Sequence, residues 1–217
     1  MKLLRSALIL GVLGGLSTPA AAQNFQFKSG SYYNNPSAFG ARVGPYRAQL
    51  LAEPGQPIVD VFCVDYFHSV STNQSWTAAF TNLATLNMSA TRQMTDFGLS
   101  QSDALMRYQM AAWLSSQFTM DNKSQWGAIH GTIWNVMSGG TAMYNGNPIP
   151  ANSTWLAGAQ GNYQSINLAE WTVVSDVAGN RQEYLMRTVV PEPETLFLFG
   201  TGLVGLAFLT FVRRRAV

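Results

Sequence analysis

The 217-residue sequence predicts an α+β domain in which β-strands flank a central helical segment, followed by a transmembrane helix at the C-terminus. Three observations lead to this prediction. Apolar and polar residues alternate in both outer parts of the domain, helix-forming residues with end signals occupy its middle, and an uncharged run of eighteen residues, 195–212, lies near the chain end. We expect the domain to comprise residues 23–190, with targeting segments at 1–22 and 191–217.

The C-terminal segment combines three features in a fixed order. These are Pro191, Glu192 and Pro193, then the uncharged run 195–212, then Arg213, Arg214 and Arg215. Eighteen helical residues span roughly 27 Å at about 1.5 Å per residue, close to the roughly 30 Å of a bilayer core. Because cytoplasmic flanks of membrane helices are rich in arginine, the cluster predicts that this end stays inside and the domain lies outside.

This arrangement resembles the PEP-CTERM sorting signal of exported bacterial proteins. The resemblance implies that an exosortase, a membrane enzyme, recognises Pro191, Glu192 and Pro193 and processes the tail. It also implies transient anchoring in the inner membrane and a final location at the cell surface or in an exopolysaccharide-containing matrix. An ordinary C-terminal anchor would give the same topology without the processing step.

The N-terminus agrees with export. Lys2 and Arg5 precede the apolar stretch 7–16, and small residues follow at 20–22. This order is typical of a signal peptide, with cleavage expected after Ala22. A retained signal anchor is the alternative, and the short apolar stretch disfavours it.

The composition of the domain excludes several classes of function. Of thirteen Lys and Arg residues, five lie in the targeting ends and eight in 23–190; of eleven Asp and Glu residues, two lie in the tail and nine in 23–190. This near-neutral balance offers no basic patch for nucleic acid. A single cysteine, Cys63, excludes an internal disulfide and the usual multi-cysteine zinc sites.

Strands are predicted at 25–27, 42–51, 58–65, 171–177 and 183–189, with a turn at 178–180 joining the last two. The run 58–65 is the strongest strand signal. Both of its faces are mostly apolar, so we expect a central strand covered on both sides. The segment 71–89 fits a hairpin and a short helix equally well.

Helices are predicted at 104–118, after a capping Ser100, at 124–137, before the glycine pair 139–140, and more weakly at 154–169. In the second helix, His130 shares one face with apolar residues, since successive side chains turn by about 100°. These are Trp126, Ile129, Ile133 and Met137. A histidine within an apolar stripe is unusual, which makes His130 a candidate site residue.

A second resemblance covers residues 57–139 and rests on three short strings, Phe62–Asp65, Ala111–Leu114 and Ile129–Asn135. They are similar to the bacterial thioester domain family, in which a strand cysteine bonds to the side-chain carbonyl of a helical glutamine and the product acylates surface amines. The resemblance makes Cys63 the thiol and Trp134 the motif tryptophan, but His130 occupies the glutamine position. Since imidazole has no carbonyl, the bond would need Gln109 or Gln125 instead.

The resulting prediction is a non-enzymatic exported protein whose domain binds or packs. Its expected partners are an exosortase-type enzyme, the inner membrane and, as ligands, extracellular polysaccharide or surface amines. One alternative is an adhesin that forms the thioester. The other is a hydrolase in which His130 activates Cys63, with Asp65 or Asn135 as orienting group.

Metal and cofactor signals are weak. His68 and Asp65 lie three residues apart, and two ligands do not make a metal site, so we expect no bound metal. Phosphate-binding glycine loops and metalloprotease or calcium motifs are not found, so we expect no cofactor.

Overall fold

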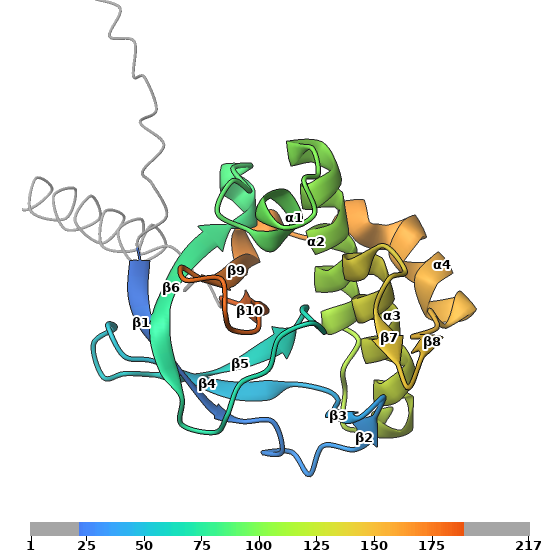
Figure 1. The fold of residues 1–217 in the computed structure, drawn as a ribbon, viewed down its shortest axis with the longest axis horizontal. Helices are drawn as coiled ribbons and strands as arrows, with labels where there is room; N and C mark the ends of the chain where they lie inside the picture. The colour runs from blue at the N-terminus through green and yellow to red at the C-terminus, as the bar shows by residue number, and fades with distance from the viewer. Residues whose placement is uncertain (1–21, 189–217) are drawn as a thin grey trace, which may run out of the picture.

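The computed structural model describes residues 22–188 (Figure 1). A barrel of β-strands forms one side of this domain and a group of helices covers the other (Figure 1). Most of the expected signal peptide and the whole tail, with its sorting residues, transmembrane helix and arginine cluster, lie outside the described residues. Among residues 22–188, no helix combines the length and apolarity needed to cross a membrane.

The barrel is closed and antiparallel, in the order β1-β4-β5-β10-β9-β6. Its strands are β1 Ala22–Ser29, β4 Tyr46–Leu50, β5 Ile58–Cys63, β6 Ser75–Asn82, β9 Trp171–Asp176 and β10 Tyr184–Arg187. Pairing of β1 with β6, where Phe25 faces Trp76, closes the circle. The last two strands of the chain are therefore inserted between β5 and β6.

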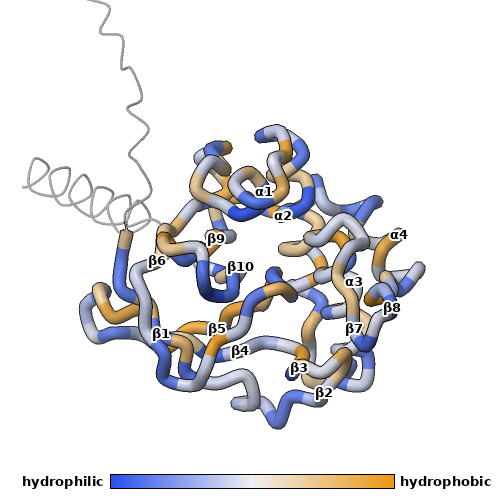
Figure 2. Tube along the Cα trace, viewed as in Figure 1, coloured by the Kyte–Doolittle hydropathy of each residue, from blue (hydrophilic) through white to orange (hydrophobic). Residues whose placement is uncertain are grey.

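Side-chain alternation along the strands produces two cores, and Figure 2 shows hydrophobic and hydrophilic residues mixed along the barrel strands. The inward side chains fill the barrel with aromatic rings, among them Phe25, Tyr46 and Tyr184. Outward side chains such as Phe62 and Leu185 join a second core with the helices. A six-stranded barrel filled in this way is a packed scaffold rather than a channel.

The α-helices are α1 Arg92–Thr95, α2 Gln101–Ser115, α3 Trp126–Ser138 and α4 Ser153–Asn162. Short 3₁₀ turns lie at Leu83–Thr85, Lys123–Gln125, Tyr163–Ser165 and Leu168–Glu170. The two-residue strands β2 Ser37–Ala38 and β3 Ala41–Arg42 form one small hairpin, and β7 Met143–Tyr144 and β8 Asn147–Pro148 form another. Buried residues of α2 and α3 share one core with the outer face of the barrel.

Local signals explain the helix ends. The Ser100 hydroxyl accepts a hydrogen bond from the Asp103 N–H at 3.1 Å, which confirms the predicted cap of α2. Gly139 takes φ 63° after α3, a left-handed conformation that suits glycine. His130 lies on the buried face of α3 with Ile129 and Ile133, as the apolar stripe predicted.

The mixed helix and strand class is confirmed, whereas several boundaries are wrong. The predicted strand 42–51 is interrupted, because Gly44 at φ 110° and Pro45 separate β3 from β4. The undecided segment 71–89 contains strand β6. The predicted helix 154–169 stops as α4 at Asn162 and continues as 3₁₀ turns. Neither α1 nor closure of the sheet into a barrel was predicted.

Candidate functional site

Cys63 and His130 lie together where the barrel meets the helical layer. Cys63 is the last residue of β5, and His130 is in the middle of α3. The Gly44 N–H donates to His130 Nδ1 at 2.9 Å, so this nitrogen is an acceptor. The proton is therefore on Nε2, which donates to the backbone carbonyl of Cys63 at 2.9 Å.

Aromatic rings enclose the imidazole. Trp134 stacks on it with ring centroids 4.3 Å apart, and Tyr46 and Phe118 lie at 5.8 and 5.6 Å. The side chain is fully buried. Burial lowers the pKa of His130 from 6.5 to about 4, so the ring is neutral at pH 7.

The Cys63 side chain is also closed off from solvent. Its Sγ–H donates to the Asp65 carbonyl at 3.1 Å, and the residue has no exposed surface. Burial, together with the nearby Asp65 carboxylate, raises the pKa of the Cys63 thiol to about 12. The sulfur is therefore a protonated thiol at physiological pH.

These contacts oppose a Cys-His nucleophilic pair. Within residues 22–188, both ring nitrogens of His130 bond to backbone groups, and neither bonds to the Cys63 sulfur. The proposed orienting groups also point elsewhere. The Asn135 amide donates to the Ile149 carbonyl at 2.8 Å, and the Asp65 carboxylate accepts from the Phe67 N–H at 2.9 Å.

Neither glutamine proposed as acyl donor makes a side-chain hydrogen bond to the thiol among the described residues. Gln125 is exposed just before α3, whereas Cys63 is buried. Gln109 lies half-buried on α2, and none of the side-chain hydrogen bonds among the described residues joins it to Cys63. Nothing in these contacts brings an acyl group to the thiol.

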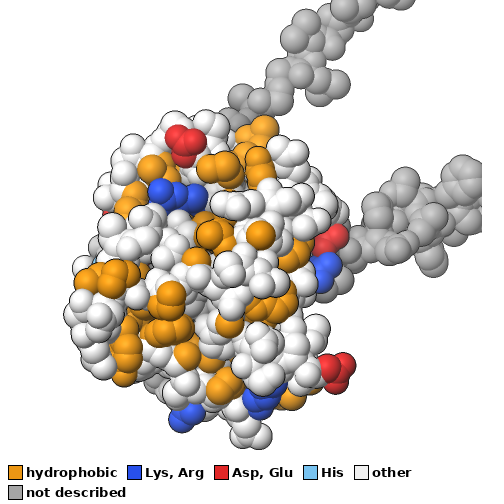
Figure 3. Space-filling view, turned by 90° about the vertical axis from the view of Figure 1, so that its right-hand side faces the viewer, with side chains coloured by type: hydrophobic (Ala, Val, Ile, Leu, Met, Phe, Trp, Pro, Cys, Tyr) orange, Lys and Arg blue, Asp and Glu red, His pale blue; other side chains and the backbone are white. Residues whose placement is uncertain are grey.

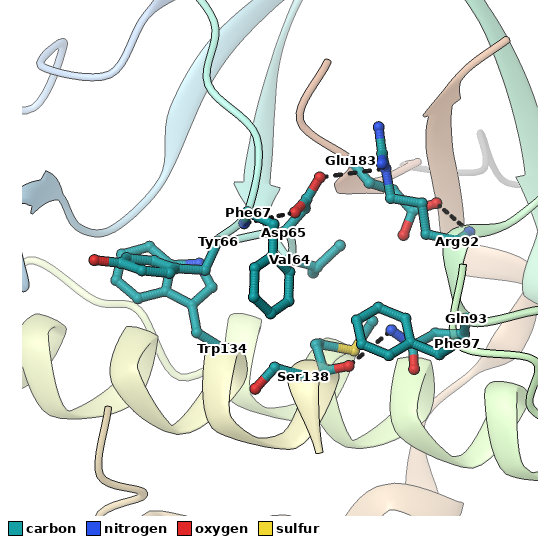
Figure 4. Close-up of a pocket in the computed structure, with 11 residues that line it drawn as sticks. Val64, Asp65, Tyr66, Phe67, Arg92, Gln93, Phe97, Trp134, Ser138 and Glu183 are labelled. Carbon is teal, nitrogen blue, oxygen red and sulfur yellow. Dashed lines mark hydrogen bonds and ion pairs between the residues drawn. The ribbon is translucent and has the colours of Figure 1, made fainter. Parts of the chain in front are cut away.

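A buried polar cluster, centred on Asp65 and Glu183, was missed by sequence reasoning (Figure 4). Asp65 Oδ2 lies 2.8 Å from His68 Nδ1 and 3.2 Å from Arg92 Nε. Glu183 accepts hydrogen bonds from the Tyr108 hydroxyl at 2.6 Å and the Arg92 N–H at 3.0 Å. Burial raises the pKa of Glu183 above its usual value.

This cluster is compensated from within the protein. The Arg92 guanidinium pairs with Asp65 and with Asp96, whereas the Glu183 carboxylate is held by hydrogen bonds from the Tyr108 hydroxyl and the Arg92 backbone N–H. No group of three His, Cys, Asp or Glu residues in the described part of the chain is placed to hold a metal ion. The adjoining pocket in Figure 4 has about 10 Å³ of free space, room for roughly one water molecule.

Figure 3 shows the helical face of the domain, on which charged side chains are few and scattered. This face carries no basic stripe of the kind that tracks a phosphate backbone.

Comparison with known proteins identifies the tail. Residues 189–215 match the PEP-CTERM protein-sorting motif. The match contains Pro191, Glu192 and Pro193 and ends at the arginine cluster. The PEP-CTERM motif indicates an exported protein that is anchored in the membrane by its C-terminus and then processed by an exosortase-type enzyme.

The domain has no comparable match. No curated protein and no solved structure matches the chain. The resemblance of residues 57–139 to thioester domains is therefore not supported by relatives of known structure or function.

Proposed function

We propose that the protein is an exosortase-sorted surface or matrix protein whose barrel domain binds or packs and does not catalyse a reaction. The sorting and export parts of this proposal rest on the PEP-CTERM motif at 189–215. The expected final location is the cell surface or the extracellular polymer, where polysaccharide is the partner we favour.

The geometry around Cys63 supports the non-enzymatic part of this proposal. A nucleophilic cysteine needs a thiolate and a base that can take its proton. Here the thiol is buried and protonated, and the His130 ring is neutral with both nitrogens engaged. These contacts are those of residues with a structural role, because the hydrogen bond between His130 and the Cys63 carbonyl joins α3 to strand β5 of the barrel.

The missing acyl donor also argues against covalent attachment to surface amines. A thioester requires a carbonyl group bonded to the sulfur, and His130 occupies the position from which the resemblance would supply it. Non-covalent association remains, and a nearly neutral domain has no strong charge repulsion from a polymer of either sign.

Processing of the tail tests the proposal. The full chain would be produced in cells with and without the exosortase, and the intact mass of the product measured. We expect a shorter product only when the enzyme is present. The double variant Pro191→Ala/Pro193→Ala should keep its tail, whereas Pro54→Ala, in an exposed loop of the domain, should be processed normally. Identical masses in both cell types would contradict the proposal.

A further inference from the structure

A pocket of about 970 Å³ lies at one end of the barrel, where β5 and β10 part. Pairing between these strands ends at Val61 and Met186, although β5 begins at Ile58. Within the described residues, the first three residues of β5, 58–60, therefore pair with β4 on one side and border the pocket on the other. The volume is at the upper end of the roughly 300–1,000 Å³ typical of ligand pockets.

The wall of this pocket is mostly apolar. It is lined by Leu50, Phe62, Phe80, Phe118, Trp171 and Met186, which come from both the inner and the outer face of the barrel and, for Phe118, from the segment after α2. An apolar lining of this size gains free energy by taking hydrocarbon out of water. The occupant should therefore have a long apolar part.

One buried hydroxyl in the lining lacks a partner. Ser115, at the end of α2, is 1% exposed, and its Oγ makes no hydrogen bond with the described protein atoms. A buried polar group without a partner is costly, so it favours a ligand atom that can bond to it. By contrast, the Arg187 guanidinium at the rim already pairs with Glu170 at 2.7 Å.

The charges at the rim select against an anionic head group. Glu53 lines the pocket, and the two other charged groups of the lining are already paired, Asp60 with Arg47 at 3.0 Å and Arg187 with Glu170 at 2.7 Å. The chemistry therefore fits a neutral amphipathic molecule, with a hydrocarbon chain in the pocket and a hydroxyl or ester oxygen at Ser115.

The position of the pocket indicates where such a molecule comes from. Thr188 lines the pocket and is the last described residue, seven positions before the uncharged run begins at Thr195. Seven extended residues reach at most roughly 25 Å. While the tail is anchored, Thr188 in the pocket lining lies within this distance of the start of the membrane-spanning run.

We infer that this pocket takes the acyl chain of a neutral monoacyl lipid from the membrane in which the protein is anchored. The source of the lipid rests on the anchoring step of the proposed function, whereas the fit of the chain rests on the pocket alone. Removal of the tail would then separate the domain from its lipid supply.

Photo-crosslinking tests this inference on the full chain. The protein would be reconstituted in phosphatidylcholine vesicles that contain a monoacylglycerol with a diazirine in its acyl chain, and the labelled peptides identified by mass spectrometry. We expect labels on pocket segments of β5, β6 and β10 as well as on the tail. The variant Ser116→Trp, at the exposed rim, should reduce pocket labelling to the level without irradiation.

Two control variants show whether the labelling depends on the pocket. Ser102→Trp, an exposed serine at the other end of α2, should leave pocket labelling unchanged. Ser115→Ala should weaken it by roughly two- to tenfold, the effect of one hydrogen bond.

The outcomes separate the two proposals. Labels on the tail but not in the pocket, or equal pocket labelling in the two tryptophan variants, would overturn the lipid site and leave the anchoring intact. A chain without labels on its tail would contradict anchoring, whatever the pocket shows.

Discussion

His130 joins three parts of the molecule through one side chain. Its Nδ1 accepts from Gly44, between β3 and β4, and its Nε2 donates to Cys63 at the end of β5, while the residue itself belongs to α3. Each neutral hydrogen bond contributes about 1 kcal/mol net, but an unpaired buried group costs more. A histidine in an apolar stripe can therefore be retained for packing and hydrogen bonding alone.

The buried imidazole should make stability depend on pH. The folded pKa of about 4 lies below the ordinary 6.5, so between these values the unfolded chain binds more protons. Stability should rise with pH through this window and be lost as pH falls from 6.5 towards 4, by up to about 3 kcal/mol. Urea unfolding at several pH values measures the effect.

The matched variant for this experiment is His130→Asn. Because burial raises the pKa of Glu183, that group acts in the opposite direction, and the informative quantity is the difference in slope between the two proteins. The variant should be less stable at pH 7 and should lose the histidine part of the slope. Equal slopes would show that His130 does not titrate as a buried neutral group.

Cys63 should be unreactive in the folded protein. Iodoacetamide modifies thiolates, and this thiol is buried with a pKa of about 12. We expect no alkylation at mildly acidic or neutral pH until urea unfolds the domain, and an intact mass that shows no loss of ammonia. Rapid labelling of the folded protein at mildly acidic pH would instead indicate an activated nucleophile and revive the hydrolase alternative.

Gly44 is the critical point of the connection between β3 and β4. Its φ of 110° suits glycine, and an added Cβ would lie 2.2 Å from the Trp126 ring. Trp126 is 1% exposed at the start of α3, so the ring has little room to move. The close approach also brings the Gly44 N–H to His130.

Gly44→Ala should therefore destabilise the domain by several kcal/mol, roughly the sum of backbone strain and overpacking. Gly55→Ala is the control, because Gly55 also has positive φ, 73°, but no atom within 4 Å of the added Cβ. It should cost only about 1 kcal/mol, the backbone term alone. Thermal or urea unfolding gives the loss of stability in each of the two variants. Equal losses of stability would mean that the contact between position 44 and Trp126 is not tight.

At the scale of the whole molecule, the sequence predicted the individual helices and strands better than the way in which they pack into a barrel. Alternation located β5 and β9, and a serine cap and a glycine stop located α2 and α3, because these signals act within a few residues. Closure depends on pairs such as Phe25 with Trp76, about fifty residues apart, and no local pattern specifies them.

In the candidate site too, local features were predicted from the sequence and long-range contacts were not. Only the family resemblance placed Cys63 near His130, and the contact observed is with the backbone carbonyl rather than the sulfur. The Asp65–Arg92 and Arg92–Glu183 contacts join residues 27 and 91 positions apart, through a four-residue helix too short to have a periodic signal. The sorting tail needed no folding argument, since its signal is contiguous in the chain.

The membrane orientation of the chain decides most directly whether the domain is exported. One epitope would be inserted at Gly146, in the exposed β7–β8 turn, and another appended after Val217; protease would then be added to spheroplasts of cells that lack the exosortase. We expect the protease to destroy the domain epitope and to leave the C-terminal epitope protected. A domain epitope protected by an intact membrane would contradict export and, with it, the proposed function.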